Sequence, residues 1–213
     1  MIETIGLREQ KSAKTKLDIL EETIQITLQK PFKELHVEEV CERVGISKVT
    51  FFKYFPQKED LLMYYLRVWC FKRAVELDRE PKEGLEGLYF LFDKMSEELE
   101  HNKRLMLGVL AQLASQDRPQ RPMPVKHEER MMLCPGLSKD DKVEILSIDQ
   151  MLEKFVLEAI LNKEITKTCN TKELSDLFMT MLFGTALNVH MQRLSPMKLV
   201  FRKNLGILIY SFR

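Results

Sequence analysis

Cationic and aromatic side chains are concentrated in one short stretch, VGISKVTFFKYFPQKEDLL at residues 44–62. Its middle, residues 45–58, contains three lysines and no acid, and four aromatic residues fall within five positions. Lysines bind phosphate, whereas hydroxyl and apolar side chains contact base edges and thymine methyl groups. The stretch therefore indicates a nucleic-acid contact. The alternative is an ordinary helical hairpin whose rings form core and whose lysines face solvent.

Local turn residues divide this stretch into two short helices. Gly45 can adopt the left-handed conformation that closes a helix over residues 37–44. Ser47 can cap the next helix, which Pro56 stops. Apolar residues at three- and four-residue steps over 17–28 predict a longer helix before them. Two short helices joined by a tight turn and packed on a longer one predict a helix-turn-helix.

In a helix-turn-helix, the second short helix enters the major groove and its early residues reach base edges. We expect Phe52 and Phe55 to face the core, and Tyr54 and Lys58 to hold flanking phosphates. The N-terminus of a helix beginning near Gln57 would add backbone N–H groups to the same contact. The predicted DNA-binding residues are Ser47, Lys48, Val49, Thr50, Phe51, Lys53, Tyr54 and Lys58.

These residues resemble the DNA-binding domain of the TetR (tetracycline repressor) family of transcription regulators. The family pattern AGVSxGTxYxYFxxKExL is similar to VGISKVTFFKYFPQKEDLL, and the lead-in LREQKSAKTKLDIL is similar to its basic approach. Val49 stands where a glycine is common and Phe52 where a tyrosine is common, so one hydroxyl contact to DNA is lost. The resemblance implies a homodimer that binds a near-palindromic DNA operator, usually as a repressor released by a small-molecule effector.

The rest of the chain also has helical periodicity, and no run alternates convincingly as a strand would. A proline-rich break at residues 119–124 interrupts it. The predicted helices cover residues 57–79, 84–101, 103–115, 139–162, 171–193 and 196–212. The sequence thus predicts an all-α protein. An N-terminal three-helix helix-turn-helix domain occupies residues 1–56, and a larger helical ligand-binding and dimerisation domain occupies residues 57–213.

Composition limits the class of protein. The 213 residues are 31% charged and 45% hydrophobic, with a net charge of +1, so an electrostatic partner must meet a local patch. The four cysteines form no CxxC pair, which favours a reducing compartment. The most apolar run, residues 177–191, is too short and too polar to cross a membrane. We therefore expect a cytoplasmic protein.

Methionine and phenylalanine are frequent on the apolar faces of the larger predicted domain. Such faces are usually plain core, because methionine fills irregular gaps. The family resemblance favours a cavity for a small apolar or amphipathic ligand instead. The predicted lining residues of this cavity are Phe90, Met95, Met106, Phe155 and Phe183.

One predicted helix, within residues 174–191, is apolar on nearly every side. Such a helix needs more cover than one intramolecular face, which indicates a subunit interface, with burial inside the monomer as the alternative. The resemblance implies a four-helix interface between two subunits. The predicted interface residues are Leu152, Phe155, Leu177, Met181, Gly184 and Thr185.

Catalytic and metal-binding patterns are missing from the sequence. The four histidines have no ligand spacing, and neither a GxSxG motif nor a Walker loop occurs. We therefore expect no enzyme, no cofactor and no metal site. Two alternatives stay open: a helical dimeric interaction protein with degenerate DNA readout, and a helical enzyme with a buried site. Sequence-selective DNA binding and a turnover screen separate them.

Overall fold

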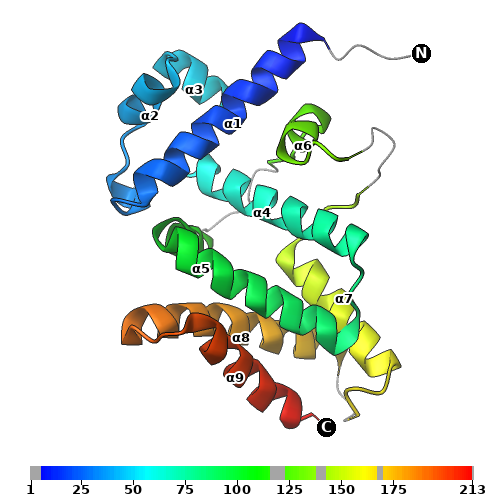
Figure 1. Cartoon of the computed structure of the whole chain (residues 1–213). Helices are drawn as coiled ribbons and strands as arrows, with labels where there is room; N and C mark the ends of the chain where they lie inside the picture. Colours follow the sequence, from blue (N-terminus) through cyan, green and yellow to red (C-terminus); the bar gives the residue numbers. More distant parts are fainter. Residues whose placement is uncertain (1–5, 116–122, 138–142, 167–169, 213) are drawn as a thin grey trace, which may run out of the picture. The chain divides into compact units, whose positions relative to one another are not determined.

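The computed structural model describes residues 6–115, 123–137, 143–166 and 170–212. Within these ranges the chain forms nine α-helices and one 3₁₀ helix but no strand, which confirms the predicted all-α class (Figure 1). No helix in these ranges is both long and apolar enough to span a bilayer. The elements are α1 (Leu7–Thr27), η1 (Phe32–Glu34), α2 (Val37–Val44), α3 (Lys48–Tyr54), α4 (Asp60–Arg79), α5 (Gly84–Ala114), α6 (His127–Leu133), α7 (Ile148–Leu161), α8 (Thr171–Gln192) and α9 (Met197–Tyr210).

The chain divides into two compact units that are interleaved in sequence. The first comprises residues 1–72 and 104–143, and the second comprises residues 73–103 and 144–213. Helices α4 and α5 contribute residues to both units. The non-helical angles of Asn102 (φ −122°, ψ 39°) interrupt α5 beside the division, which confirms the predicted break between two helical segments. The predicted functional boundary after residue 56 stays a prediction.

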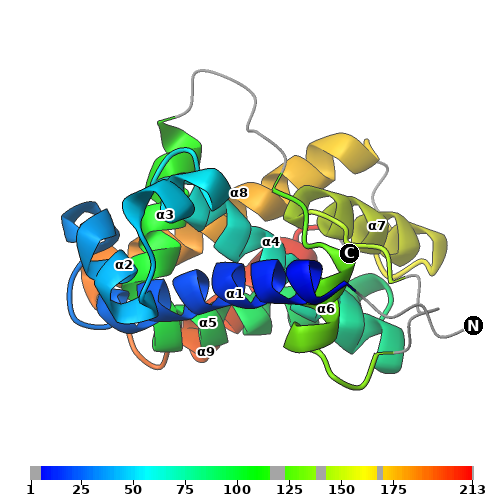
Figure 2. The ribbon, with the colours of Figure 1, turned by 90° about the horizontal axis from the view of Figure 1, so that it is seen from above.

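In the first unit, α1 packs against α2 and α6, and a tight turn joins α2 to α3 (Figure 2). The predicted apolar stripe of α1 is only partly right, because Leu28 is 46% exposed and Leu20 is fully buried. Lys16 and Thr23 lie in the buried face instead. The reason is that α1 is covered by two elements, and α6 supplies a partner for Lys16.

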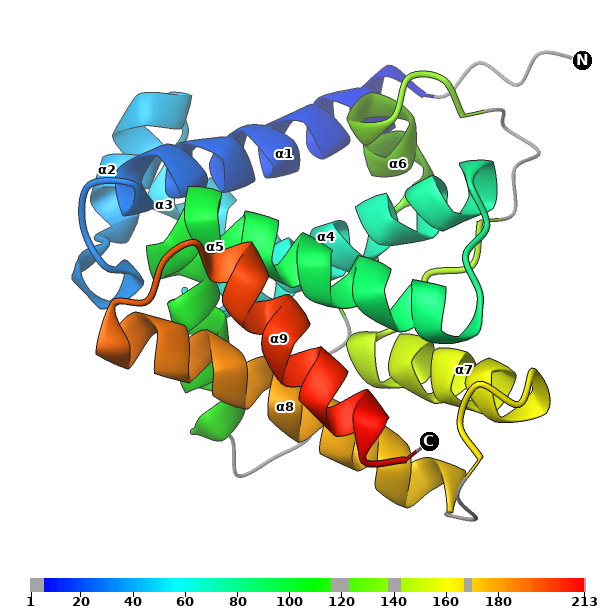
Figure 3. The same cartoon turned by 60° about the horizontal axis from the view of Figure 1, so that its bottom comes forward.

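In the second unit, α8 packs against both α7 and α9 (Figure 3). Helix α5 approaches α7 closely, because a Cβ on Gly87 would lie 2.2 Å from the ring of Phe155. Arg202 of α9 donates two hydrogen bonds to Asp93 of α5, at 2.8 and 2.5 Å. Burial raises the pKa of Asp93, but hydrogen bonds from Arg202 and Lys198 outweigh it and hold that pKa below its ordinary value.

Two helices begin later than predicted. Helix α4 begins at Asp60, whose carboxylate accepts the backbone N–H of Gln57 at 2.8 Å, so residues 57–59 form a turn. Helix α7 begins at Ile148 after Ser147, which caps it. Residues 143–147 are not helical, and residues 139–142 of the predicted helix lie outside the described residues, as do residues 119–122 of the proline-rich break.

Candidate DNA-binding interface

The turn between α2 and α3 has the geometry of a helix-turn-helix. Gly45 is left-handed (φ 75°, ψ 38°), and its N–H donates to the carbonyl of Cys41 at 2.9 Å. Ser47 is extended, and its hydroxyl accepts the backbone N–H of Thr50 at 3.2 Å. Both predictions about these turn residues are confirmed. A glycine closes one helix and a capping serine starts the next, so the angle between α2 and α3 is fixed locally.

The faces of α3 differ from the prediction at two aromatic positions. Phe51 is fully buried and packs on Phe55, whose ring in turn lies 5.6 Å from that of Tyr64. Phe52 is 45% exposed and Val49 is 82% exposed. The predicted DNA contact by Phe51 and the predicted core position of Phe52 are therefore wrong. Positions 51 and 55 share one helix face and positions 49 and 52 the other.

Lys48 is held at the surface by an ion pair with Glu38 of α2. The hydrogen bond from Lys48 lowers the pKa of Glu38. Both side chains are more than half exposed, and exposed ion pairs contribute little to stability. Lys48 can therefore exchange Glu38 for a DNA phosphate at little cost.

A basic groove lies between the start of α1 and the end of α3. Its volume is about 400 Å³, and the described residues that line it provide three cations and three hydroxyl groups but no acid. Two of its residues, Lys53 and Tyr54, were predicted to contact DNA. The other contributors were missed, although the basic lead-in pointed to this segment. The groove is lined by Leu7, Arg8, Lys11, Ser12, Thr15, Lys53 and Tyr54.

Lys58, predicted to contact a phosphate, forms hydrogen bonds within the chain. Its ammonium donates to the carbonyls of Phe32, Lys33 and Leu35 at 3.5, 3.4 and 3.2 Å. It also lies 5.1 Å from the centre of the Phe32 ring. An ammonium has three donors, and the loop around η1 uses all three. The predicted phosphate contact of Lys58 stays a prediction, and it would require the ammonium to give up some of these carbonyls.

A buried polar network ties α6 to α1 and α4 within the first unit. Glu129 is 2% exposed and accepts hydrogen bonds from Lys16 at 3.1 and 3.2 Å, from the Tyr64 hydroxyl at 2.8 Å and from the Lys126 N–H at 3.0 Å. The ammonium of Lys16 also lies 3.8 Å from the centre of the Tyr64 ring. Burial lowers the pKa of Lys16, with the charge of Glu129 opposing it, and burial raises the pKa of Tyr64.

Residues 19–64 match the family described as "Bacterial regulatory proteins, tetR family", and this range contains the helix-turn-helix. This part of the chain is therefore a TetR-family DNA-binding domain. A curated relative, the uncharacterized HTH-type transcriptional regulator YvkB of Bacillus subtilis, is 21% identical over 169 residues, or 78% of each chain.

Solved structures of TetR regulators share the fold. FadR of Thermus thermophilus, a repressor in complex with lauroyl-CoA, has a TM-score of 0.61 at 18% identity, covering 91% of this chain and 93% of FadR. FadR of Bacillus subtilis, in complex with stearoyl-CoA, has a TM-score of 0.61 at 15% identity and covers 92% and 99%. These likenesses confirm the predicted fold.

The residues predicted to line the ligand cavity differ in burial. Met95, Met106 and Phe155 are fully buried, whereas Phe90 and Phe183 are half-buried. Phe155 fills the space above Gly87, as plain core does. A cavity shared by these five side chains stays a prediction.

The predicted subunit-interface residues separate into two groups. Leu152, Phe155 and Thr185 are buried within the chain, and Thr185 accepts a hydrogen bond from Asn204 at 3.0 Å. These three face the core of the second unit, so their predicted interface role is wrong. Leu177 and Gly184 are exposed, and a Cβ added to Gly184 would meet nothing within 4 Å. Met181 is half-buried.

Proposed function

We propose that this TetR regulator is a homodimeric repressor that binds a near-palindromic operator and is released by a small apolar or amphipathic ligand. One observation carries the DNA-binding part of the proposal. The exposed face of α3 lies beside a groove in which Arg8, Lys11 and Lys53 gather, with no acid among the described residues that line it. Base-reading and phosphate-binding side chains therefore share one surface, as specific DNA recognition requires.

The chemistry of this surface indicates how the operator is read. Val49 and Phe52 offer apolar groups that suit the methyl group of thymine. Arg8, Lys11 and Lys53 supply the cations that hold the DNA backbone on either side. Phosphate contacts of this kind set affinity and its salt dependence, whereas the apolar contacts set sequence preference.

The dimer is supported by a stripe of exposed residues along α8. Leu177, Thr180, Gly184, Leu187 and Met191 recur at alternating steps of three and four residues, and all five are exposed. This is the spacing of a helix–helix seam, and glycine allows a close approach of backbones. Two further exposed leucines on α7, at 47% and 70%, are Leu157 and Leu161.

Ligand release is supported by the FadR complexes with lauroyl-CoA and stearoyl-CoA. These relatives favour an acyl compound or another elongated apolar molecule as effector. Release requires that the ligand and the operator prefer different states of the protein, and their coupling is reciprocal. A ligand that binds both states equally would not release DNA, however tightly it binds.

Fluorescence anisotropy with labelled DNA tests the interface. We expect Lys11→Gln and Lys53→Gln each to weaken binding to all sequences alike and to lower the salt slope by about 1. Lys14→Gln is the matched control, because Lys14 is exposed on the same helix, pairs with Asp18 and does not line the groove. Val49→Ala should weaken binding to the operator more than to random DNA.

The same assay distinguishes the proposed repressor from an interaction protein that lacks specific DNA readout. If the wild-type protein binds its own upstream region no better than random DNA at every salt concentration, specific readout is lost. The helical interaction protein with degenerate DNA readout would then describe this chain. Lysine variants that bind all DNA as well as wild type would show that the groove does not contact phosphate.

Analytical ultracentrifugation, which measures the oligomeric state, tests whether the exposed stripe on α8 is a subunit interface. Gly184→Arg places a charged side chain in the stripe and should give a monomer with lower operator affinity but normal helicity. His190→Arg is the matched control, because His190 is exposed on the same helix and lies about 120° around its axis from Gly184. A wild-type monomer at micromolar concentration, or a Gly184→Arg dimer, would overturn the proposed interface.

A further inference from the structure

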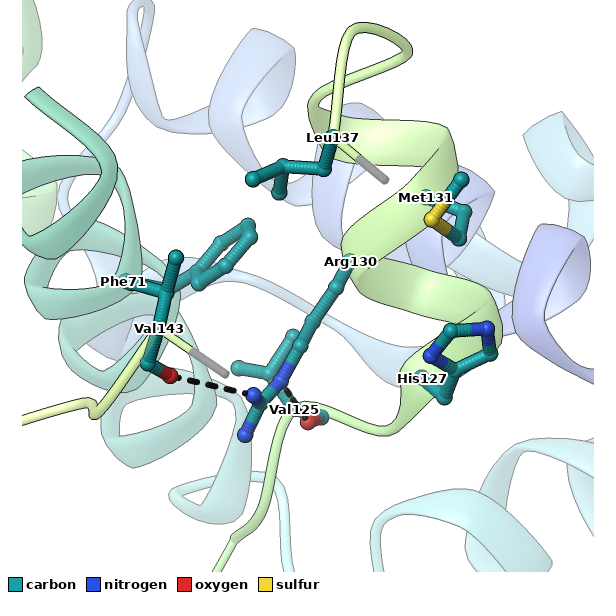
Figure 4. A pocket seen from close by; sticks show the side chains of 7 residues that line it. All are labelled: Phe71, Val125, His127, Arg130, Met131, Leu137 and Val143. Atoms are coloured by element: carbon teal, nitrogen blue, oxygen red, sulfur yellow. Dashed lines mark hydrogen bonds between the residues drawn. The ribbon is translucent and has the colours of Figure 1, made fainter. Parts of the chain in front are cut away.

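A cavity of about 250 Å³ lies beside α6, within the first unit. Its buried side chains, Phe71, Val125 and Val143, are apolar, whereas His127 is exposed. Figure 4 shows Arg130 extending between the Phe71 side and the His127 side of this space. The lining is formed by Phe71, Val125, His127, Arg130, Met131, Leu137 and Val143.

The guanidinium of Arg130 is fixed across the cavity. Its Nε donates to the carbonyl of Val125 at 3.0 Å and one terminal nitrogen donates to that of Val143 at 3.3 Å, as the dashed lines in Figure 4 mark. Its central carbon lies 5.8 Å from the centre of the Phe71 ring. Within the described chain these bonds use two of the five N–H donors that a guanidinium has. The others can bind an anion.

The charges around this guanidinium favour an anionic ligand. Among the described residues, the lining contains Arg130 and His127 and no acid. The buried acid next to Arg130 in sequence is Glu129, whose carboxylate is already bound by Lys16 and Tyr64. Arginine binds carboxylates with paired, charge-assisted hydrogen bonds. An aromatic or aliphatic body would contact Phe71, Met131 and Leu137.

We propose that this cavity binds a small monocarboxylate with a compact apolar body, held by Arg130. Its volume corresponds to about eight water-sized atoms at about 30 Å³ each, which is the size of hexanoate or benzoate. An entire acyl-CoA is too large for this space. The binding of a carboxylate does not depend on the proposed function. Only its role does, since we infer that this carboxylate is the effector of the proposed repressor.

The position of the cavity gives its ligand a route to the DNA-binding helices. Arg130 contacts the cavity, and the adjacent Glu129 binds Lys16 of α1. Helix α1 also supplies Arg8 and Lys11 to the basic groove. A ligand that binds Arg130 therefore acts directly on α6, which is tied to α1 by the Lys16–Glu129 pair. This connection lies within one compact unit.

Isothermal titration of the full-length, DNA-free protein with benzoate and hexanoate tests the site. We expect stoichiometric binding of the acids and binding about 10- to 100-fold weaker for benzamide and hexanamide, which lack the charge. Arg130→Lys keeps a cation but loses the planar fork, and should weaken binding of the acids while leaving that of the amides unchanged. Amides that bind as well as acids would overturn the proposal.

A cavity-filling variant keeps the test independent of Arg130. Met131→Trp places a larger side chain in the cavity and should reduce binding of both acids at least 10-fold. Met132→Trp is the matched control, because Met132 is 40% exposed, neighbours Met131 and does not line the cavity. Binding that Met131→Trp leaves unchanged would place the ligand elsewhere and refute the site. So would the lack of any binding by the wild type at millimolar ligand.

Operator binding is measured separately, so the two proposals can fail separately. Carboxylates that bind in the Arg130-dependent manner support the cavity even if the protein proves not to bind a specific operator. Conversely, a repressor that binds its operator but takes up neither acid retains its proposed function and loses this site.

Discussion

The buried network of Lys16, Glu129 and Tyr64 can be perturbed by a single substitution that removes its negative charge. The effect is measured on the stability of the first unit. Glu129→Gln keeps the size of the side chain but removes the charge that neutralises Lys16. Lys16, 8% exposed in the folded chain, would keep only neutral partners and no counter-charge. These are the amide oxygen of the new glutamine, the Pro124 carbonyl at 3.4 Å and the Tyr64 ring. Breaking a buried ion pair by removing one partner costs about 3–5 kcal/mol.

An upper limit follows from the chemistry of lysine. A buried lysine without a counter-ion can lose its proton rather than remain charged. From an ordinary pKa of 10.5, deprotonation at pH 7 costs about 4.8 kcal/mol, at about 1.36 kcal/mol for each pH unit. The same step at pH 9 costs about 2 kcal/mol. The penalty of Glu129→Gln should therefore shrink as the pH rises from 7 to 9.

The sign of this effect can be checked from proton binding. In the variant the folded state disfavours charged Lys16, so its folded pKa lies below its unfolded pKa. The unfolded state then binds more protons between these two values, and stability rises with pH across that window. A Glu129→Gln penalty that grew with pH would contradict the reasoning.

Urea unfolding followed by fluorescence of Trp69, the single tryptophan, reports on the first unit, which contains it. A penalty of about 4 kcal/mol with an m-value of about 2 kcal/mol/M lowers the midpoint by about 2 M. Lys14→Gln is the control, since it breaks an exposed pair on the same helix and should cost at most about 1 kcal/mol. Equal midpoints for Glu129→Gln and Lys14→Gln would refute the energetic role of the network.

Two further predictions concern α3 and the second unit. Phe51→Ala should cost about 3–5 kcal/mol in the same urea assay, whereas the exposed Phe52→Ala should change stability by less than about 0.5 kcal/mol; equal losses would contradict the observed faces. Asp93 has a lowered pKa, so its stabilisation is present above 3.8 and is lost as pH falls through the folded value. In acid titrations followed by circular dichroism, Asp93→Asn should lose part of the wild-type pH dependence; an unchanged profile would contradict it.

Features specified by neighbouring residues could be predicted from the sequence. Gly45 and Ser47 defined the turn between α2 and α3, because a left-handed position and a serine cap each depend on a few adjacent backbone groups. The interruption of α5 at Asn102 agrees with the predicted break between helices 84–101 and 103–115. Helix type and order, and with them the fold class, were determined by the same local patterns.

Features that depend on distant partners could not be predicted. The seven-residue α3 has too few turns for periodicity to decide whether Phe51 or Phe52 is buried. In the structure Phe51 is buried and packs on Phe55, whose ring lies beside that of Tyr64 of α4. The role of Lys58 depends on three carbonyls more than twenty residues earlier in the chain. Nothing in the local sequence of either segment specifies such pairings.

The buried face of α1 shows why this distinction matters for function. Lys16 is 113 positions from Glu129, so a sequence pattern places it on a solvated face although it is buried. A buried ion pair contributes little net stability compared with apolar packing, but it is costly to separate. It therefore favours one placement of α6 against α1 over all others. A ligand that moved α6 would have to carry α1 with it or separate the pair. Either outcome would couple the cavity beside Arg130 to the helix that supplies Arg8 and Lys11 to the basic groove.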